Sequence, residues 1–205
     1  MDASKFLYLT KDRGWTSQQS VPAAQWKCGY CNREVGAQTG WQIADAQGHL
    51  MYIRPCSYCN GPTLFLEGDR EYSPGPLPGN PVEHLPAETE SLFAEARTAT
   101  AAGAYTAAVL TCRKILMHIA VDKGADKNKN FLEYITYLIN KGYAPPNSQD
   151  WVDYIRTRSN EANHEIVLMK TDDAIALVTF VEMLLRFVFE LPKSVPAPVP
   201  PAATT

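Results

Sequence analysis

The pattern of hydrophobic and polar positions changes its character about 80 residues into the chain. Before that point, apolar residues occur in short runs between turn-forming residues, which is typical of strands. We predict strands in three such pieces: KFLYL (5–9), GWQIADAQGHLMYIR (40–54) and PTLFLEG (62–68). Within the middle piece, DAQGH (45–49) indicates a turn between two strands. The first part of the chain is therefore predicted to be β-rich.

The second part of the chain follows a helical pattern. The segment YSPGPLPGNPVEHLP (72–86) separates the two parts as a linker, because its prolines and glycines disfavour both helix and ladder pairing. From Pro86 onward, apolar residues recur every three to four positions, which is the period of an amphipathic helix. The predicted helices cover about 87–102, 105–123, 130–140, 149–167 and the residues from Thr171 to just before Pro192.

Three of these predicted helices have a clear apolar face. The inward-facing residues are Tyr105, Ala108, Cys112, Ile115 and Ile119 in the second helix, Leu132, Ile135 and Ile139 in the third, and Leu177, Phe180, Val181, Leu184, Leu185 and Val188 in the fifth. The predicted fold class is mainly α, an antiparallel bundle of about five helices preceded by a small β-rich module. The predicted domains are residues 1–80 for the module, 81–192 for the bundle and 193–205 for a disordered Pro/Ala tail.

Composition and charge limit the possible partners. Of the 205 residues, 45% are hydrophobic and 20% are charged, which is the balance of a globular protein. The net charge of −3 argues against coating nucleic acid through bulk positive charge, so any such contact must be local. The N-terminal residues lack the pattern of a signal peptide, and apolar runs such as ALVTFVEMLL (176–185) are too short to span a bilayer. We expect a cytoplasmic protein with reduced cysteines and no membrane contact.

Two Cys-x-x-Cys pairs give the first candidate site. Cys28 and Cys31 lie in CGYC, and Cys56 and Cys59 lie in CSYC, with a β-like segment between the pairs. Each short turn directs two thiolates at one point, and two turns complete a tetrahedron with Zn–S distances of about 2.3 Å. A β-module this small also lacks the core to fold without a staple. We predict a structural zinc ion in a zinc ribbon, with no open position for catalysis.

Other roles for the cysteines are weaker. Disulfides would need an oxidising compartment, and a thioredoxin-type redox pair would need one Cys-x-x-Cys near a βαβ pattern. The fifth cysteine, Cys112, lies on an apolar stripe and is predicted to be a small buried hydrophobe.

The first part of the chain also carries an aromatic and basic set suited to stacking on bases or to binding a protein. Its members are Trp15, Trp26, Tyr30, Arg33, Trp41, Tyr52, Arg54 and Tyr58. The alternative, which we favour, is that the aromatics pack a small core.

The second candidate site is the stretch RTRSNEANHEI (156–166) in the predicted fourth helix. Arg156, Asn160 and His164 are spaced at i, i+4 and i+8, so they form one polar stripe, whereas Arg158 lies about 120° from His164 on the helical wheel. The histidine can transfer a proton near neutral pH, and a guanidinium can stabilise charge on a phosphorus-centred transition state. The asparagine can orient the ring or hold a phosphate oxygen.

The alternative is that this stripe is a solvated helix face, with Asn160 and His164 in hydrogen bonds between helices. The spacing by itself favours that interpretation, because histidine is often a surface or capped residue. The same residue types recur by chance in RKILMH (113–118) of the second helix.

The region from about Ala87 to Pro192 resembles the domain-of-unknown-function family number 4145, a member of the HEPN superfamily of α-helical bundles. The resemblance rests on AYTAAVLTCRKIL (104–116), WVDYIRTRSNEANHE (151–165) and TDDAIALVTFVEMLLRFVFELP (171–192). The middle piece is similar to that family's Ile-Arg-x-x-Gly-Asn-x-x-x-His signature. A zinc ribbon ahead of the helical domain is also a familiar arrangement in the family.

The resemblance implies an activity. In HEPN ribonucleases the motif is Arg-x(4–6)-His, which Arg158 and His164 fit. Asn160 and His164 fit the Asn-x-x-x-His half of a tighter version, in which an arginine stands where this chain has Ser159. The implied protein is a metal-independent RNA endonuclease of a defence or toxin-like system. His164 would be its general acid/base, and Arg158 or Arg156 would stabilise the phosphate. The ribose 2′-hydroxyl would be the nucleophile, leaving a cyclic phosphate.

The resemblance also implies a homodimer, because active HEPN domains generally pair two such helices around one cleft. Two further hypotheses stay open. In one, the protein is a non-catalytic module that binds nucleic acid, a nucleotide or a protein. In the other, it is an assembly subunit whose polar stripe lines a dimer interface. The acidic balance of the chain favours these two, and the Arg/Asn/His stripe favours RNA cleavage.

Overall fold

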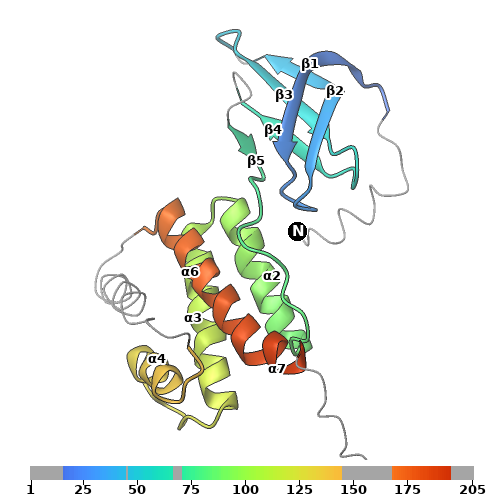
Figure 1. Cartoon of the computed structure of the whole chain (residues 1–205). Helices are drawn as coiled ribbons and strands as arrows, with labels where there is room; N and C mark the ends of the chain where they lie inside the picture. Colours follow the sequence, from blue (N-terminus) through green and yellow to red (C-terminus); the bar gives the residue numbers. More distant parts are fainter. Residues whose placement is uncertain (1–15, 45, 67–70, 145–167, 195–205) are drawn as a thin grey trace, which may run out of the picture. The chain divides into compact units, whose positions relative to one another are not determined.

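The computed structural model describes residues 16–44, 46–66, 71–144 and 168–194 (Figure 1). The chain divides into two compact units. One unit comprises the residues up to Pro78 together with 97–105, and the other comprises 79–96 together with the residues from Thr106 onward. The first unit contains a β-sheet, and most of the helical residues belong to the second unit.

The first unit is built on a five-stranded antiparallel sheet in which the strands follow one another in chain order. The strands are β1 (Gln19–Lys27), β2 (Glu34–Ala44), β3 (Leu50–Pro55), β4 (Pro62–Phe65) and β5 (Tyr72–Ser73). Ala44 pairs with Leu50, so the predicted turn at 45–49 is confirmed. This order places the first cysteine pair in the β1–β2 connection and the second in the β3–β4 connection.

Aromatic side chains fill the core of the sheet. The core residues are Val21, Trp26, Tyr52 and Phe65. The Trp26 ring meets Phe65 edge-on at 5.1 Å between centroids, and its Nε1 donates to Thr63 Oγ1 at 3.1 Å. The Arg54 side chain is fully buried, with its guanidinium 4.6 Å from the Tyr52 ring centroid and 4.4 Å from that of Phe65. The prediction that aromatics of this module pack a core is confirmed for Trp26 and Tyr52.

Strand β1 was not predicted, because QSVPAAQWK contains a proline and no clear alternation. Among the described residues β1 pairs with β2 alone, and its register shifts between Ser20 and Ala24. An edge strand with an irregularity tolerates Pro22, since the missing N–H breaks no regular ladder. The Pro22 carbonyl accepts a hydrogen bond from Arg54 Nη2 at 3.1 Å, so the irregular backbone is tied to the core.

The helices have nearly the predicted bounds. They are α2 (Ala87–Ala101), α3 (Tyr105–Asp122), α4 (Phe131–Asn140) and α6 (Thr171–Leu185), the last continuing through the π-helical η2 (Arg186–Glu190) into α7 (Leu191–Ser194). The predicted apolar faces of α3 and α6 are confirmed, because Ile115, Ile119, Leu177 and Leu184 are among their buried residues. No helix in the described ranges is long and apolar enough to cross a membrane.

Two helical details differ from the prediction. Helix α4 buries Tyr134, Ile135 and Leu138, whereas the predicted core residue Leu132 is 39% exposed. The Tyr134 ring takes the inward position, and its hydroxyl accepts a hydrogen bond from the Lys129 backbone. The last helix passes Pro192 and ends at Ser194, because a π-helical turn just before the proline widens the helix where its ring would otherwise crowd the preceding turn.

The prediction of a mainly α protein with a bundle of about five helices is wrong. The described residues form a five-stranded sheet with its own core in addition to the helices, so the class is α+β. The sheet was underestimated because β1 contains Pro22 and because β5 lies inside the segment predicted as a linker. The predicted helix at 149–167, the predicted strand at 5–9 and residues 195–205 of the predicted tail lie outside the described residues.

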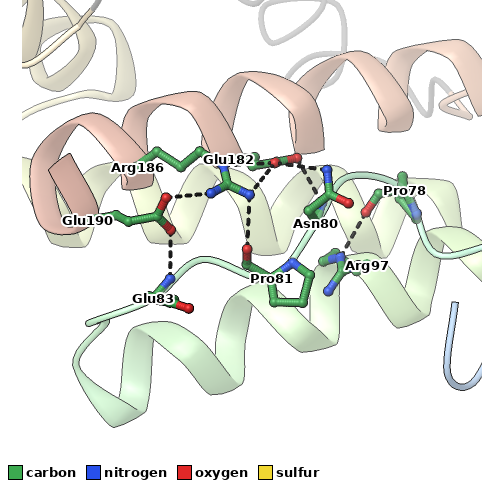
Figure 2. A network of polar contacts seen from close by, with 8 residues as sticks. All are labelled: Pro78, Asn80, Pro81, Glu83, Arg97, Glu182, Arg186 and Glu190. Carbon is green, nitrogen blue, oxygen red and sulfur yellow. Dashed lines mark hydrogen bonds and ion pairs between the residues drawn. The ribbon is translucent and has the colours of Figure 1, made fainter. Parts of the chain in front are cut away.

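Three charged side chains of α6 and η2 hold the linker segment 79–83 (Figure 2). We call Glu182, Arg186 and Glu190 the linker clamp. Glu182 accepts hydrogen bonds from the backbone N of Asn80 at 3.0 Å and from its side-chain amide at 3.4 Å. A Cβ at Gly79 would lie 2.4 Å from Glu182 Oε2, so the close approach of the linker requires glycine there.

Arg186 and Glu190 complete the clamp at four-residue spacing along the helix. Arg186 Nη2 donates to the Pro81 carbonyl at 3.0 Å, and Glu190 accepts from the backbone N of Glu83 at 2.8 Å. Arg186 also forms ion pairs with both Glu182 and Glu190. The linker therefore lacks regular structure at this point but is fixed by hydrogen bonds to its backbone.

Candidate metal centre

The four paired cysteines converge on one point. All four sulfurs lie within 4.8 Å of one another, with Cys28 Sγ 3.8 Å from Cys59 Sγ and Cys31 Sγ 3.8 Å from Cys56 Sγ. A tetrahedron of sulfurs around a metal at about 2.3 Å has edges of about 3.8 Å. The cysteines are free thiols, and Cys28 and Cys56 are buried while Cys31 and Cys59 are partly buried. The arrangement is compatible with metal binding.

Each cysteine pair lies in a turn that fixes its sulfurs through backbone hydrogen bonds. In the first turn, the Cys28 N–H donates to the Arg33 carbonyl at 2.9 Å, and the Asn32 N–H donates to the Cys28 carbonyl at 2.8 Å. The second turn repeats these bonds with Cys56, Gly61 and Asn60. Both asparagines have positive φ, 57° at Asn32 and 60° at Asn60, a conformation that asparagine tolerates better than most residues.

Backbone N–H groups point at the sulfurs in both turns. The Tyr30 N–H lies 3.4 Å from Cys28 Sγ, and the N–H groups of Tyr58 and Cys59 lie 3.4 Å from Cys56 Sγ. Such donors stabilise the charged thiolate, which is the form that binds a metal. The backbone of each turn therefore stabilises a negatively charged sulfur without help from other side chains.

The pKa values of two opposing sulfurs are driven apart. The pKa of Cys28 is lowered to about 5, first by the hydrogen bond from the Cys59 thiol, while burial opposes the shift and the backbone N–H groups of Cys31 and Tyr30 add to it. The pKa of Cys59 is raised, first by the same hydrogen bond to Cys28 and then by burial. The lowered pKa of Cys28 favours its thiolate, which is the form of cysteine that binds a metal.

The two turns cover each other's tyrosines. The guanidinium of Arg33 lies 3.5 Å from the centroid of the Tyr58 ring. A Cβ at Gly61, which stands at the matching position of the other turn, would lie 2.4 Å from a carbon of the Tyr30 ring. Gly61 is thus required for the two turns to interlock, whereas Tyr58 remains 60% exposed next to Arg33.

The sequence analysis placed Arg33 and Tyr58 in one aromatic and basic set with Trp26 and Tyr52, for which it favoured core packing of the aromatics, and so did not separate this exposed pair. The signal that could have done so is the repeat CGYCNR and CSYCNG, in which a tyrosine and an asparagine recur around each cysteine pair. The prediction for Cys112 is confirmed, because it is fully buried and burial raises the pKa of its thiol to about 12.

The predicted catalytic residues Arg156, Arg158, Asn160 and His164 lie outside the described residues, and so does Trp15. Among the described residues of the helical unit there is instead a pocket of about 540 Å³ between α3 and α4. Its lining residues are Leu110, Arg113, Lys114, Met117, His118, Val121, Lys127 and Tyr134. Sequence reasoning set aside RKILMH (113–118) as a chance recurrence, but the structure brings Arg113 and His118 to one site.

A small sheet closed by four clustered cysteines, followed by a largely separate set of helices, defines a two-part protein with a metal-compatible centre in its first part. Residues 94–197 match the family model described as "Domain of unknown function (DUF4145)", and the chain belongs to that family. The family assignment predicted from the helical motifs is thereby confirmed. Comparisons with curated proteins and with solved structures give no match.

Proposed function

We propose that the four clustered cysteines bind one zinc ion with a structural role. Four thiolates fill a tetrahedral shell and leave no open position for a substrate, and two of the sulfurs belong to buried residues. Tetrahedral S₄ sites hold zinc or iron. Elemental analysis should give one zinc per chain, and the purified protein should be colourless. A coloured protein that contains iron bound by thiolates would contradict the proposal.

The ribbon held by this ion is proposed to bind single-stranded nucleic acid, RNA above all. The stacked pair of Arg33 and Tyr58 carries this proposal, because an exposed ring has no part in the core and a base can stack on it. The guanidinium beside the ring supplies a positive charge for the backbone phosphate. Such a local contact is consistent with a chain whose net charge is −3.

Binding of fluorescent single-stranded RNA by the whole protein tests the contact. Tyr58→Ala should raise Kd about 5- to 150-fold, because a stacked base contributes about 1–3 kcal/mol. Ile43→Ala removes another exposed apolar side chain of the same sheet and should leave Kd unchanged. All variants should retain one zinc. An unchanged Kd in Tyr58→Ala would refute RNA binding at this pair.

A second candidate function is metal-independent RNA cleavage by the helical domain, which would then belong to the HEPN superfamily. The spacing of Arg158 and His164 in the sequence favours it, together with Asn160 four residues before the histidine. In this proposal His164 takes the proton of a ribose 2′-hydroxyl, whose oxygen attacks the phosphorus. The bond to the 5′ oxygen breaks, leaving a 2′,3′-cyclic phosphate and a 5′-hydroxyl.

Incubation of the purified protein with mixed RNA, with and without a chelator, tests cleavage. We expect cyclic-phosphate ends in both cases, because no metal takes part in the reaction. His164→Ala should lower the rate by about 10²- to 10⁴-fold, and His49→Ala should not. Arg158→Ala and Arg156→Ala would show which guanidinium contacts the phosphate. RNA that stays intact with the wild-type protein would leave the protein as a binding module.

We further propose that the protein acts in the cytoplasm as a homodimer formed through its last helix. Met183, Phe187 and Leu191 recur at four-residue spacing and are 37%, 39% and 51% exposed. An apolar stripe of this kind is buried at modest cost by a second copy of the same surface.

A further inference from the structure

The pocket between α3 and α4 carries a concentration of positive charge. Six of its lining residues come from one face of α3, at positions 110, 113, 114, 117, 118 and 121. Lys127 closes the pocket from the α3–α4 connection, and Tyr134 closes it from α4. Of the ionisable side chains, Arg113, Lys114, Lys127 and His118 can all donate hydrogen bonds to an anion, and no carboxylate is among the lining residues.

These cations are not neutralised by the part of the chain that the structure describes. Arg113, Lys114 and Lys127 form no ion pair with a described carboxylate, whereas the neighbouring Lys123 pairs with Asp122 and Lys129 pairs with Glu133. Three cations without a described ion-pair partner share one pocket of an acidic chain, and an anion in that pocket would reduce their mutual repulsion.

Arg113 is the best placed of the three. Its guanidinium lies 4.6 Å from the centroid of the Phe131 ring, at the first residue of α4. The ring face holds the group through a cation–π contact without using its N–H donors. Burial lowers the pKa of Arg113, but a guanidinium stays charged at neutral pH. No hydrogen bond to the described residues uses its N–H groups, so they can bind a ligand that presents a planar array of oxygens.

The rest of the pocket is apolar. Leu110, Met117 and Val121 contribute aliphatic or thioether surface, and the Tyr134 ring adds an aromatic wall. The volume of about 540 Å³ lies within the range of small-molecule sites, about 300–1,000 Å³. A bare inorganic anion would leave this apolar surface in water, and a purely apolar ligand would leave the cations unpaired.

We propose that this pocket binds a nucleoside phosphate. The phosphates would contact Arg113, Lys114 and Lys127, and the base would pack against Met117 and the neighbouring apolar wall. A phosphate carries more charge and more acceptor oxygens than a carboxylate, so it matches several convergent donors better. The described residues that line this pocket include none of the four cysteines of the metal centre and no residue of the stretch 156–166. The proposal therefore stands or falls without them.

The test is calorimetric titration of the whole zinc-loaded protein with AMP, ATP, inorganic phosphate and a single-stranded RNA without a terminal phosphate. ATP should bind with a Kd below about 100 μM, more tightly than inorganic phosphate by about tenfold or more. The double variant Lys114→Glu with Lys127→Glu should weaken ATP binding by at least about tenfold. Lys141→Glu reverses a single charge outside the pocket and should alter Kd less than about twofold.

A variant at Arg113 keeps the result interpretable if the double variant proves unstable. Arg113→Lys retains a positive charge but loses the planar fork, so it should weaken ATP binding with an unchanged melting temperature. The proposal is overturned if ATP binds no better than inorganic phosphate, or if both pocket variants bind ATP like the wild type. RNA without a terminal phosphate that competes with ATP at equal affinity would also overturn it, and would assign the pocket to a nucleic-acid backbone.

Discussion

Replacing Glu182 by alanine should destabilise the helical unit, because it removes the centre of the linker clamp. The change deletes two hydrogen bonds to Asn80 and the ion pair with Arg186. The Glu182 side chain is 11% exposed, so the carboxylate is nearly desolvated, whereas Arg186 is 32% exposed and keeps its second partner, Glu190. The loss of stability therefore comes mainly from the linker, which loses its hydrogen bonds, because Arg186 is not left as an unpaired buried charge.

The magnitude follows from these contacts. The 3.0 Å bond from the Asn80 backbone to this carboxylate contributes about 1.5–3 kcal/mol, the longer 3.4 Å contact with the Asn80 amide adds little, and the partly exposed ion pair adds about 0–1 kcal/mol. We expect the free energy of unfolding to fall by about 2–4 kcal/mol in Glu182→Ala. Glu182→Gln should lose about half as much, because its amide oxygen still accepts from the Asn80 backbone while the charge is lost.

Urea unfolding followed by far-UV circular dichroism measures this loss, with the slope of the transition as a check that the unfolded state is unchanged. Glu95→Ala removes an exposed carboxylate of α2 and should change the free energy of unfolding by less than about 0.5 kcal/mol. If Glu182→Ala unfolds at the same urea concentration as Glu95→Ala, the clamp adds no stability and our reading of its contacts is wrong.

Other substitutions test the remaining sites. Cys56→Ser should abolish stoichiometric zinc and unfold the sheet while the helical signal persists; a full zinc complement would contradict the ligand set. Gly61→Ala should lower the affinity for zinc, measured in competition with a chelating dye, because the added methyl group displaces the Tyr30 ring. A zinc affinity equal to that of the wild type would show that the close packing of Gly61 and Tyr30 is unimportant for metal binding. Iodoacetamide at about pH 8 should spare Cys112 until the protein unfolds, because its thiol stays protonated below about pH 12; labelling in the native state would refute its burial. Phe187→Glu should convert the dimer to a monomer in light scattering, and a monomeric wild type would disprove the dimer.

The cysteine centre could be predicted from the sequence because its information is local. Each pair is held by a turn of about six residues whose cysteine spacing and asparagine determine the backbone. The helices were predictable for a similar reason, since their apolar faces repeat within a few residues. The fold class was not, because an edge strand such as β1 depends on its partner more than on its own residues.

Long-range contacts set the other limit. Asn80 and Glu182 are 102 residues apart, and neither shows by itself that the linker backbone is held by the last helix. The position of Arg54 was also not predictable from the sequence. An arginine in a strand is expected at the protein surface, but the guanidinium of Arg54 is buried near the rings of Tyr52 and Phe65. The pocket at Arg113 needed the fold as well, since Lys127 and Tyr134 reach it from outside α3.

The two edges of the sheet have a consequence for how copies of the protein meet. Among the described residues, β5 forms one edge and has only two residues, and β1 forms the other with Pro22 and a shifted register. Neither edge offers a long regular row of free N–H and C=O groups to another strand. These described edges thus protect the sheet against growing by strand addition into aggregates. A specific association between copies must then use side-chain surfaces, such as the apolar stripe of the last helix, and not shared β-structure.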